Sequence, residues 1–292
     1  MCYECRQTMK SFRDTIRLGR TGLATRRMGI GADAGIRADA LEWAFERGIN
    51  YFYWGTRRTP GMKQAIRTLA PRHRERMVVA LQTYDITGIA MDWSIRRGLR
   101  QLRLDYADVL ILGKRDHPVP RRIQDKALAL REAGLVRHLC VSAHDRRTYA
   151  AHLASGIFDV VMVRYNCAHP GAEEEVFPLV AALDPRPGVI VYNSTRWGHL
   201  CDPAWMPAGE RTPEPTHLYR HALSHPAVDM VLTAPTTKEQ LEANVKALDQ
   251  GPLTADESAW LERIGRHVRA RNPSTEWDFL FKQRGARKQE QR

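Results

Sequence analysis

The sequence lacks the features that mark membrane and secreted proteins. No window holds 18 uncharged apolar residues, so we expect no transmembrane helix. The N-terminal stretch MCYECRQTMKSFRDTIRLGR has no apolar central run, which argues against a signal peptide. We therefore expect a cytoplasmic protein that does not bind membranes.

Cysteine is scarce, and its distribution excludes two further classes. The five cysteines are an odd and scattered set, which does not suggest a disulfide framework: Cys2, Cys5, Cys140, Cys167 and Cys201. Cys2 and Cys5 form a C-x-x-C pair, but a zinc site needs four ligands and no second pair follows. We predict no metal site, and we interpret the pair as part of an exposed, reduced tail.

Acidic residues are few relative to basic ones. The chain has 45 Lys and Arg against 33 Asp and Glu, a net charge of +12. Such an excess attracts polyanions, but the charge is spread along the chain and no nucleic-acid-binding motif accompanies it. We expect a small anionic substrate or a nucleotide as the partner, and no nucleic acid.

The sequence does contain a regular alternation of apolar runs and amphipathic stretches. Strands are predicted at 26–31, 50–54, 77–83, 107–113, 136–142, 158–166, 188–194 and 228–234. Helices are predicted at 37–48, 61–70, 92–104, 121–134, 146–155, 173–183, 215–225 and 237–248. Most of these strands are apolar on both faces, as in a parallel sheet covered by helices. Eight such units predict an α/β fold of the (β/α)8 barrel type.

We expect one domain over residues 1–292, because no linker-like stretch interrupts the pattern. The barrel core should span about residues 17–250, preceded by a short N-terminal hairpin across the bottom of the barrel. Residues 251–292 should form a C-terminal helix and a solvated basic tail. A doubly wound sheet is the alternative, but no G-x-G-x-x-G follows the first strand.

Active sites of such barrels form where the strands end, at their C-terminal edge. This rule selects a set rich in cations and aromatic rings and poor in acids: Tyr53, Trp54, Arg57, Arg58, Gln82, Tyr84, Asp85, Gly113, Lys114, Asp116, His117, Ser142, His144, Arg146, Arg164, Tyr165, Asn166, His169, Tyr192, Ser194, Arg196, Trp197, His199, Thr236, Thr237 and Lys238. Arginine presents a planar fork to phosphate or carboxylate. We predict a basic pocket for an anionic ligand, on which five side chains converge: Arg58, Lys114, His144, Arg164 and Arg196.

Single residues allow more than one interpretation. His144 and His169 could act as general acids or bases, or serve as hydrogen-bonding structural residues. Lys114 could stabilise a developing oxyanion or face solvent. Trp54 and Trp197 could stack on a flat ligand or pack against the top of the barrel.

Several segments resemble the aldo/keto reductase family over about residues 17–250. RLGRTGLATRRMGIG is similar to the family's N-terminal hairpin and first strand, and ALEWAFERGINYF to its first helix and second strand. LRQLRLDYADVLIL resembles the segment L-x-x-L-x-x-D-Y-x-D, LREAGLVRHLCVS resembles L-x-x-x-G-x-x-R-x-x-G-V-S, and TTKEQLEANVKAL resembles the helix that holds the adenosine end of NADP. The resemblance implies the barrel fold and carbonyl reduction by hydride transfer from NADPH.

The family's catalytic Asp, Tyr, Lys and His are all replaced here. By the resemblance they fall on Tyr53, Arg58, Gln82 and Gly113. Gly113 should leave space where the family has a ring, and we expect Tyr53 or Arg58 to refill part of it.

The resemblance also implies a cofactor, NADP(H). Ala143 and Met162 replace two of the family's nicotinamide contacts. The residues expected to bind the cofactor are Ser142, Asn166, Tyr192, Ser194, Arg196, Thr237, Lys238 and Asn244.

Three functions remain open from the sequence. The first is an oxidoreductase of aldo/keto reductase type with a rebuilt active site. The second is a non-redox enzyme, a lyase, isomerase or hydrolase, acting on an anionic small molecule. The third is a non-catalytic metabolite- or nucleotide-binding protein. The candidate catalytic residues are Tyr84, Lys114, His144, Arg58 and Arg164.

Overall fold

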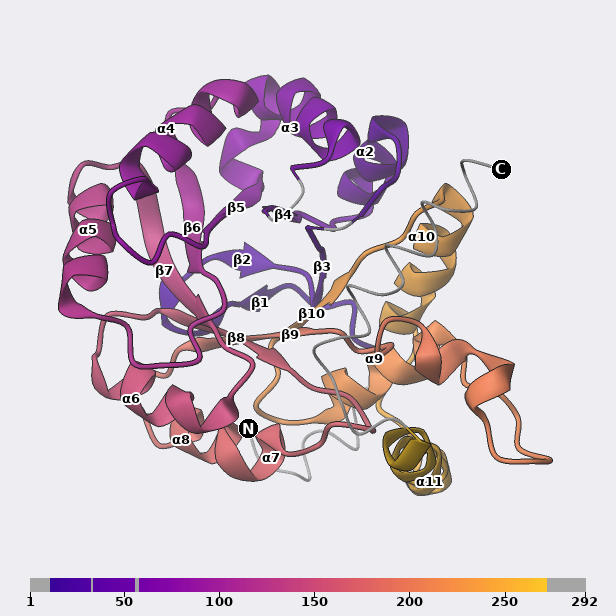
Figure 1. The fold of residues 1–292 in the computed structure, drawn as a ribbon. Helices are drawn as coiled ribbons and strands as arrows, with labels where there is room; N and C mark the ends of the chain where they lie inside the picture. The colour runs from indigo at the N-terminus through magenta and orange to yellow at the C-terminus, as the bar shows by residue number, and fades with distance from the viewer. Residues whose placement is uncertain (1–10, 33, 56–57, 272–292) are drawn as a thin grey trace, which may run out of the picture.

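The protein is a closed barrel of eight parallel strands surrounded by helices (Figure 1). The structure, a computed structural model, describes residues 11–32, 34–55 and 58–271. The barrel strands, in chain order, are β3 (Met28–Ile30), β4 (Tyr51–Trp54), β5 (Val78–Thr83), β6 (Ala107–Leu112), β7 (Val136–Ser142), β8 (Val160–Arg164), β9 (Gly188–Tyr192) and β10 (Met230–Thr233). Strand β10 pairs with both β9 and β3, which closes the barrel. The predicted fold is therefore confirmed. The Cys2 and Cys5 pair, Arg57 and the basic tail lie outside the described residues.

Helices follow the strands as the amphipathic stretches predict. They are α2 (Ala38–Glu46), α3 (Pro60–His73), α4 (Met91–Leu102), α5 (Arg121–Glu132), α6 (Tyr149–Ala154), α7 (Ala172–Glu175), α8 (Phe177–Ala181), α9 (Pro215–Ser224), α10 (Lys238–Val245) and α11 (Ala255–Arg271). In α4, for example, Ile95, Leu99 and Leu102 lie on one face and are buried. No helix in the described ranges is both long and apolar enough to cross a membrane.

One predicted helix is divided in two. The stretch 173–183 forms α7 and α8, with a break at Val176, whose φ of −126° is not helical. Pro178 explains the break, because it has no backbone N–H and its ring would clash with the carbonyl four residues earlier in a continuous helix.

A short hairpin closes the bottom of the barrel, as expected. It is made of β1 (Ile16–Arg17) and β2 (Ala24–Thr25), joined through the 3-10 turn η1 (Gly19–Thr21). Leu18 is fully buried among the side chains of the barrel interior. Gly19 has a φ of +49° and lies so close to the first residue of β9 that no side chain fits there.

Buried carboxylates join neighbouring strands near their N-terminal ends. Asp229 accepts a hydrogen bond of 2.8 Å from the backbone N–H of Val189 and pairs with Arg186. Asp108 and Asp159 likewise accept hydrogen bonds from backbone N–H groups of the preceding strands. The donors are Val79 at 2.8 Å and Leu139 at 3.0 Å. These contacts stabilise the bottom of the barrel, which leaves the opposite rim for function.

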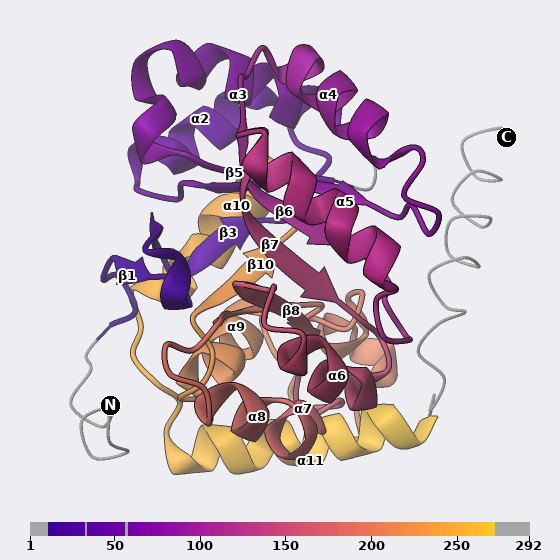
Figure 2. The ribbon, with the colours of Figure 1, turned by 90° about the vertical axis from the view of Figure 1, so that its left-hand side faces the viewer.

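The predicted C-terminal helix, α11, packs beside α9 (Figure 2). An apolar cluster joins it to η4 (His199–Cys201) and to the loop after β8: Cys167, Ala168, Leu200, Leu218, Trp260, Leu261, Ile264 and Val268. The long connection between β9 and α9, residues 193–214, is thereby held against α11.

Candidate functional site

The rim at the C-terminal ends of the strands carries most of the unusual backbone of this chain. Among the described residues, six non-glycine residues have positive φ, and five of them lie in loops at this rim: Arg58, Lys114, Asn193, Arg196 and Trp197. Such conformations cost free energy and cluster at functional sites. The rim is therefore the part of the molecule in which to look for a site.

Tyr192 lies at the centre of the rim. It ends β9 and is in register with Arg164, which ends β8. Burial raises the pKa of Tyr192 to about 12, Arg164 and Ser142 oppose this rise, and Asp116 and Tyr84 add to it. These four side chains come from β8, β7 and the loops after β6 and β5, so they surround one phenol.

At the ends of β8 and β9, four buried polar atoms have no hydrogen-bond partner among the described residues. They are Arg164 Nε, Tyr192 Oη, Asn193 Nδ2 and Ser194 Oγ. Arg164 is only 8% exposed. Buried polar groups in proteins are nearly always paired, because leaving one unpaired costs about 1–3 kcal/mol. The ends of β8 and β9 therefore leave hydrogen-bonding positions that a ligand could fill.

The positions next to Gly113 form a neutral cluster. Tyr53 donates a hydrogen bond to Oε1 of Gln82. A side chain at Gly113 would overlap the Gln82 amide, and its Cβ would lie 2.7 Å from Cε1 of Tyr84. The space expected at Gly113 is thus filled by Gln82 and Tyr84. We expected Tyr53 or Arg58 to refill part of this space; the nearest side chains are instead those of Gln82, which comes from the neighbouring strand, and Tyr84.

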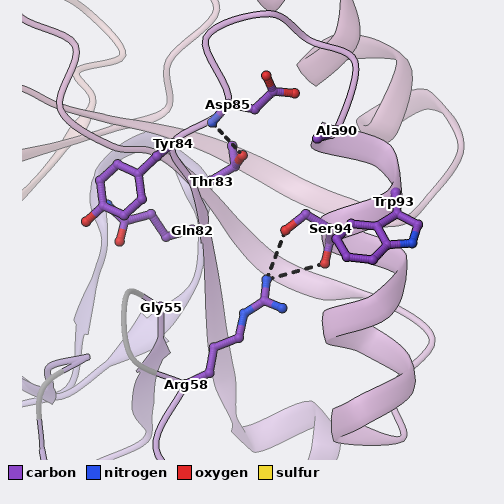
Figure 3. A pocket seen from close by; sticks show the side chains of 9 residues that line it. All are labelled: Gly55, Arg58, Gln82, Thr83, Tyr84, Asp85, Ala90, Trp93 and Ser94. Carbon is purple, nitrogen blue, oxygen red and sulfur yellow. Dashed lines mark hydrogen bonds between the residues drawn. The ribbon is translucent and has the colours of Figure 1, made fainter.

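Arg58 turns outward to α4. Its Nη2 donates to the carbonyl and hydroxyl oxygens of Ser94, at 3.3 and 3.2 Å (Figure 3). The guanidinium also lies 5.3 Å from the centre of the Trp54 ring. Burial and the nearby Arg97 lower the pKa of Arg58. It lines a cleft of about 360 Å³ at the edge of the rim.

Arg196 turns the other way and is fully buried. Its Nη1 donates to the carbonyl of Val268 in α11 at 2.9 Å, and its Nε donates to Nε2 of His169 at 3.2 Å. Burial, Arg164 and other cations lower the pKa of His169 to about 3, so His169 is neutral and accepts this bond. Arg196 therefore anchors the loop after β9.

The expected convergence of five cationic or ionisable side chains on one pocket is not what the structure has. Arg58 and Arg196 point to different helices outside the barrel wall, α4 and α11. Lys114 is exposed. His144 is half-buried, and its backbone N–H donates to Asp116. Only Arg164 of the five is buried at the centre of the rim beside Tyr192.

Two rim residues were missed by the sequence analysis. Asn193 has a φ of +62°, and its carbonyl accepts a hydrogen bond of 2.8 Å from Asn166. Arg115 is buried and donates to the carbonyl of Asp85 at 2.6 Å, while its own carbonyl contacts His152. An asparagine directly after a strand was a usable signal for Asn193, because asparagine tolerates left-handed backbone.

Among the expected cofactor-binding residues at the ends of β7, β8 and β9, Asn166 is engaged within the protein. Its Nδ2 donates to Asn193, and its Oδ1 accepts from the backbone of Ala168 at 3.0 Å. Ser142 is buried beside Tyr192, and Ser194 is buried on the next loop. Among these residues, the side chains with an unfilled hydrogen-bonding position are those of Tyr192 and Ser194.

The residues expected at the adenosine end lie on α10: Thr237 and Lys238 at its start, and Asn244 near its C-terminal end. Thr237 caps this helix by accepting a hydrogen bond of 3.2 Å from the backbone of Gln240. Asn244 donates to the hydroxyl of Thr233 at 2.9 Å and is buried. Lys238 is 44% exposed, and its nearest carboxylate is 3.9 Å away. Lys238 can therefore turn to a phosphate, whereas Thr237 and Asn244 support the helix.

Within residues 11–32, 34–55 and 58–271, no group of three or more His, Cys, Asp or Glu side chains is arranged to hold a metal ion.

Solved structures show which known proteins have this barrel. No protein-family model matches the chain, and no curated protein does. An aldo-keto reductase from Bacillus halodurans is similar in its holo form, with a TM-score of 0.71 and 20% identity over 86% of this chain and 96% of the other. Its apo form gives the same score over 95% of its length. A protein from Pseudomonas aeruginosa described as an aldo-keto reductase gives a TM-score of 0.65 at 20% identity, over 82% of this chain and 97% of the other. At this identity the likeness shows the fold, and the chain thus resembles the aldo-keto reductases in its fold.

Proposed function

We propose that this protein is an oxidoreductase of aldo-keto reductase type that binds NADP(H) at the rim of the barrel. The observation that carries the proposal is the group of four unpaired, buried polar atoms at the ends of β8 and β9. A ligand with several polar atoms would satisfy them, and a dinucleotide has such atoms along its whole length. A reductase of similar fold is described in a holo form, which supports a bound cofactor on this fold.

The cofactor would be held by a smaller set of residues than the sequence suggests. Tyr192, Ser194 and Arg164 have unfilled positions at one end, and Lys238 is available at the other. Arg196 is committed to α11, so it positions the loop rather than binding phosphate directly. The side chains that would contact the cofactor are therefore those of Tyr192, Ser194, Arg164 and Lys238.

When bound, NADPH would supply the hydride that reduces a carbonyl carbon. A side chain at the rim would then supply the proton that completes the alcohol. We assign this role to Tyr84, which is 49% exposed and lies beside Gln82 and Gly113. Arg164 supplies positive charge near Tyr192, where negative charge on a bound ligand is stabilised.

A second candidate is a non-catalytic binding protein on the same barrel. The hydrogen bond between Tyr53 and Gln82 favours it, because this pair is neutral and lies at the C-terminal ends of the neighbouring strands β4 and β5. A non-redox enzyme has less support. Three arginines of the expected basic pocket would have to clamp its anionic substrate together, but Arg58, Arg164 and Arg196 lie at three different places.

Turnover distinguishes the two remaining candidates. NADPH oxidation is followed by absorbance while a panel of aldehydes and ketones is supplied to the full chain. We expect reduction of at least one carbonyl compound, and Tyr84→Phe should bind NADPH normally but lose turnover. NADPH binding with no turnover on any compound would favour the binding protein instead.

A further inference from the structure

The cleft beside Arg58 is lined by residues that are not among the proposed cofactor contacts. It lies between the loop after β4 and the start of α4, and its lining residues are Gly55, Arg58, Gln82, Thr83, Tyr84, Asp85, Ala90, Trp93 and Ser94. Its volume of about 360 Å³ falls in the range of small-molecule sites. Gln82 and Tyr84 also border the barrel rim, so the cleft is continuous with the candidate active site.

Large aromatic surface is exposed on two sides of this cleft. Tyr84 is 49% and Trp93 is 58% exposed, although both have large rings. In Figure 3 the two rings lie on opposite sides of the Arg58 guanidinium. Exposed aromatic rings that line a concave site commonly cover the flat part of a ligand.

The described residues do not neutralise the positive charge in the cleft. Among the described residues, the hydrogen bonds of Arg58 go to Ser94, and no carboxylate lies within ion-pair distance. The guanidinium of Arg97 lies over the Trp93 ring, and its positive charge repels that of Arg58. A bound anion would relieve this repulsion.

The acid that lines the cleft does not serve as this anion. Oδ1 of Asp85 accepts hydrogen bonds from the backbone of Thr87 and Gly88, at 2.8 and 3.0 Å. Burial raises the pKa of Asp85, but these hydrogen bonds outweigh it and lower the pKa overall. Asp85 is thus turned into its own loop and stays ionised there.

The backbone of Arg58 gives independent support. Its φ is +47°, a conformation that costs a non-glycine residue free energy. In this conformation the side chain is directed between β5 and α4 (Figure 3).

We propose that this cleft binds a flat aromatic carboxylate, with the anion on Arg58 and the ring covered by Tyr84 and Trp93. If the proposed function holds, the substrates are aromatic carbonyl compounds that carry a carboxylate. Binding of an aromatic carboxylate in the cleft does not itself require the cofactor.

Calorimetric titration of the full chain without NADPH tests the proposal, with 2-naphthoate as the probe and neutral 2-naphthalenemethanol as its uncharged counterpart. We expect saturable binding of naphthoate and at least tenfold weaker binding of the alcohol. Arg58→Gln and Trp93→Ala should each weaken naphthoate binding at least tenfold. The matched control is Arg96→Gln. Arg96 lies on α4, as Trp93 does, but it is exposed and paired with Asp92, so this variant should bind naphthoate as the wild type does.

Three outcomes would overturn the inference: no naphthoate binding at millimolar concentration, equal binding of the alcohol, or unchanged binding by Arg58→Gln. Circular dichroism of each variant establishes that it is folded, and Trp93→Ala tests the cleft even if Arg58→Gln does not fold. Because NADPH is absent, failure of the cofactor proposal would leave this result unaffected.

Discussion

Replacing Glu257 with alanine should destabilise the protein, because this residue holds α11 in two ways. Its carboxylate accepts two hydrogen bonds from Arg220 of α9, at 2.8 and 2.9 Å. It also accepts from the backbone N–H of Thr254 at 2.8 Å, while the hydroxyl of Thr254 accepts from the backbone of Glu257. This reciprocal pair is a capping box at the start of α11.

The expected loss is about 3 kcal/mol. Removing one partner of a buried ion pair costs about 3–5 kcal/mol, because the other charge is left unpaired. The side chains of Arg220 and Glu257 are 11% and 22% exposed, so the pair is not fully shielded from water. Arg220 also keeps the carbonyls of Gly251 and Pro252 as acceptors. These two features place the loss at the lower end of the range.

Urea denaturation at pH 7 measures this loss, and Glu262→Ala is the matched control. Glu262 lies on the same helix, but its pair with Arg266 is exposed and 3.9 Å long. The control should cost less than about 0.5 kcal/mol, as surface pairs do. Equal losses in the two variants would refute the reasoning.

The stability lost in Glu257→Ala should also depend on pH. The hydrogen bonds from Arg220 lower the pKa of Glu257 in the folded protein. Its contribution is therefore fully present above the unfolded pKa of about 4.3 and is lost as pH falls through the lower folded value. The difference between wild type and Glu257→Ala should shrink below about pH 4. A difference that stays constant down to pH 3 would contradict the assignment.

Three shorter predictions concern other parts of the chain. Asp229→Ala should cost about 3 kcal/mol in urea denaturation, because it breaks an ion pair and leaves the N–H of Val189 without an acceptor; a loss below about 1 kcal/mol would show that this carboxylate is not needed. His169 has its pKa lowered to about 3, so its imidazole nitrogen-15 shifts should not titrate between pH 5 and 8; a titration step there would disprove the buried neutral form. Gly113→Ala should fold but displace the Gln82 amide, which a crystal structure of the variant would show, and an unmoved Gln82 would be inconsistent with the packing.

The fold could be predicted from the sequence because its determinants are local. Apolar strands such as YFYW (Tyr51–Trp54) are buried on both faces, and each amphipathic helix presents one buried face to them. The division of the helix at 173–183 was also encoded locally, in Pro178. It was not predicted because the spacing of apolar residues carries no information about a missing backbone N–H.

The candidate site could be predicted only in part, because the direction of a long side chain depends on distant contacts. The strand-end rule selected Arg164 and Arg196 equally. Arg196 turns away because its acceptor, the carbonyl of Val268, lies 72 residues further along the chain. Gln82 fills the space at Gly113 because the two strands are neighbours in register, which the sequence of either strand alone does not contain.

A fluorescence titration with NADPH determines whether the unpaired polar atoms at the ends of β8 and β9 receive NADP(H). We predict saturable binding by the full chain. Arg164→Ala should weaken this binding by about 1.5–3 kcal/mol, the value of a hydrogen bond to a charged group, while Arg96→Gln should leave it unchanged. The absence of binding up to millimolar NADPH, or an Arg164→Ala variant that binds as tightly as the wild type, would contradict the account.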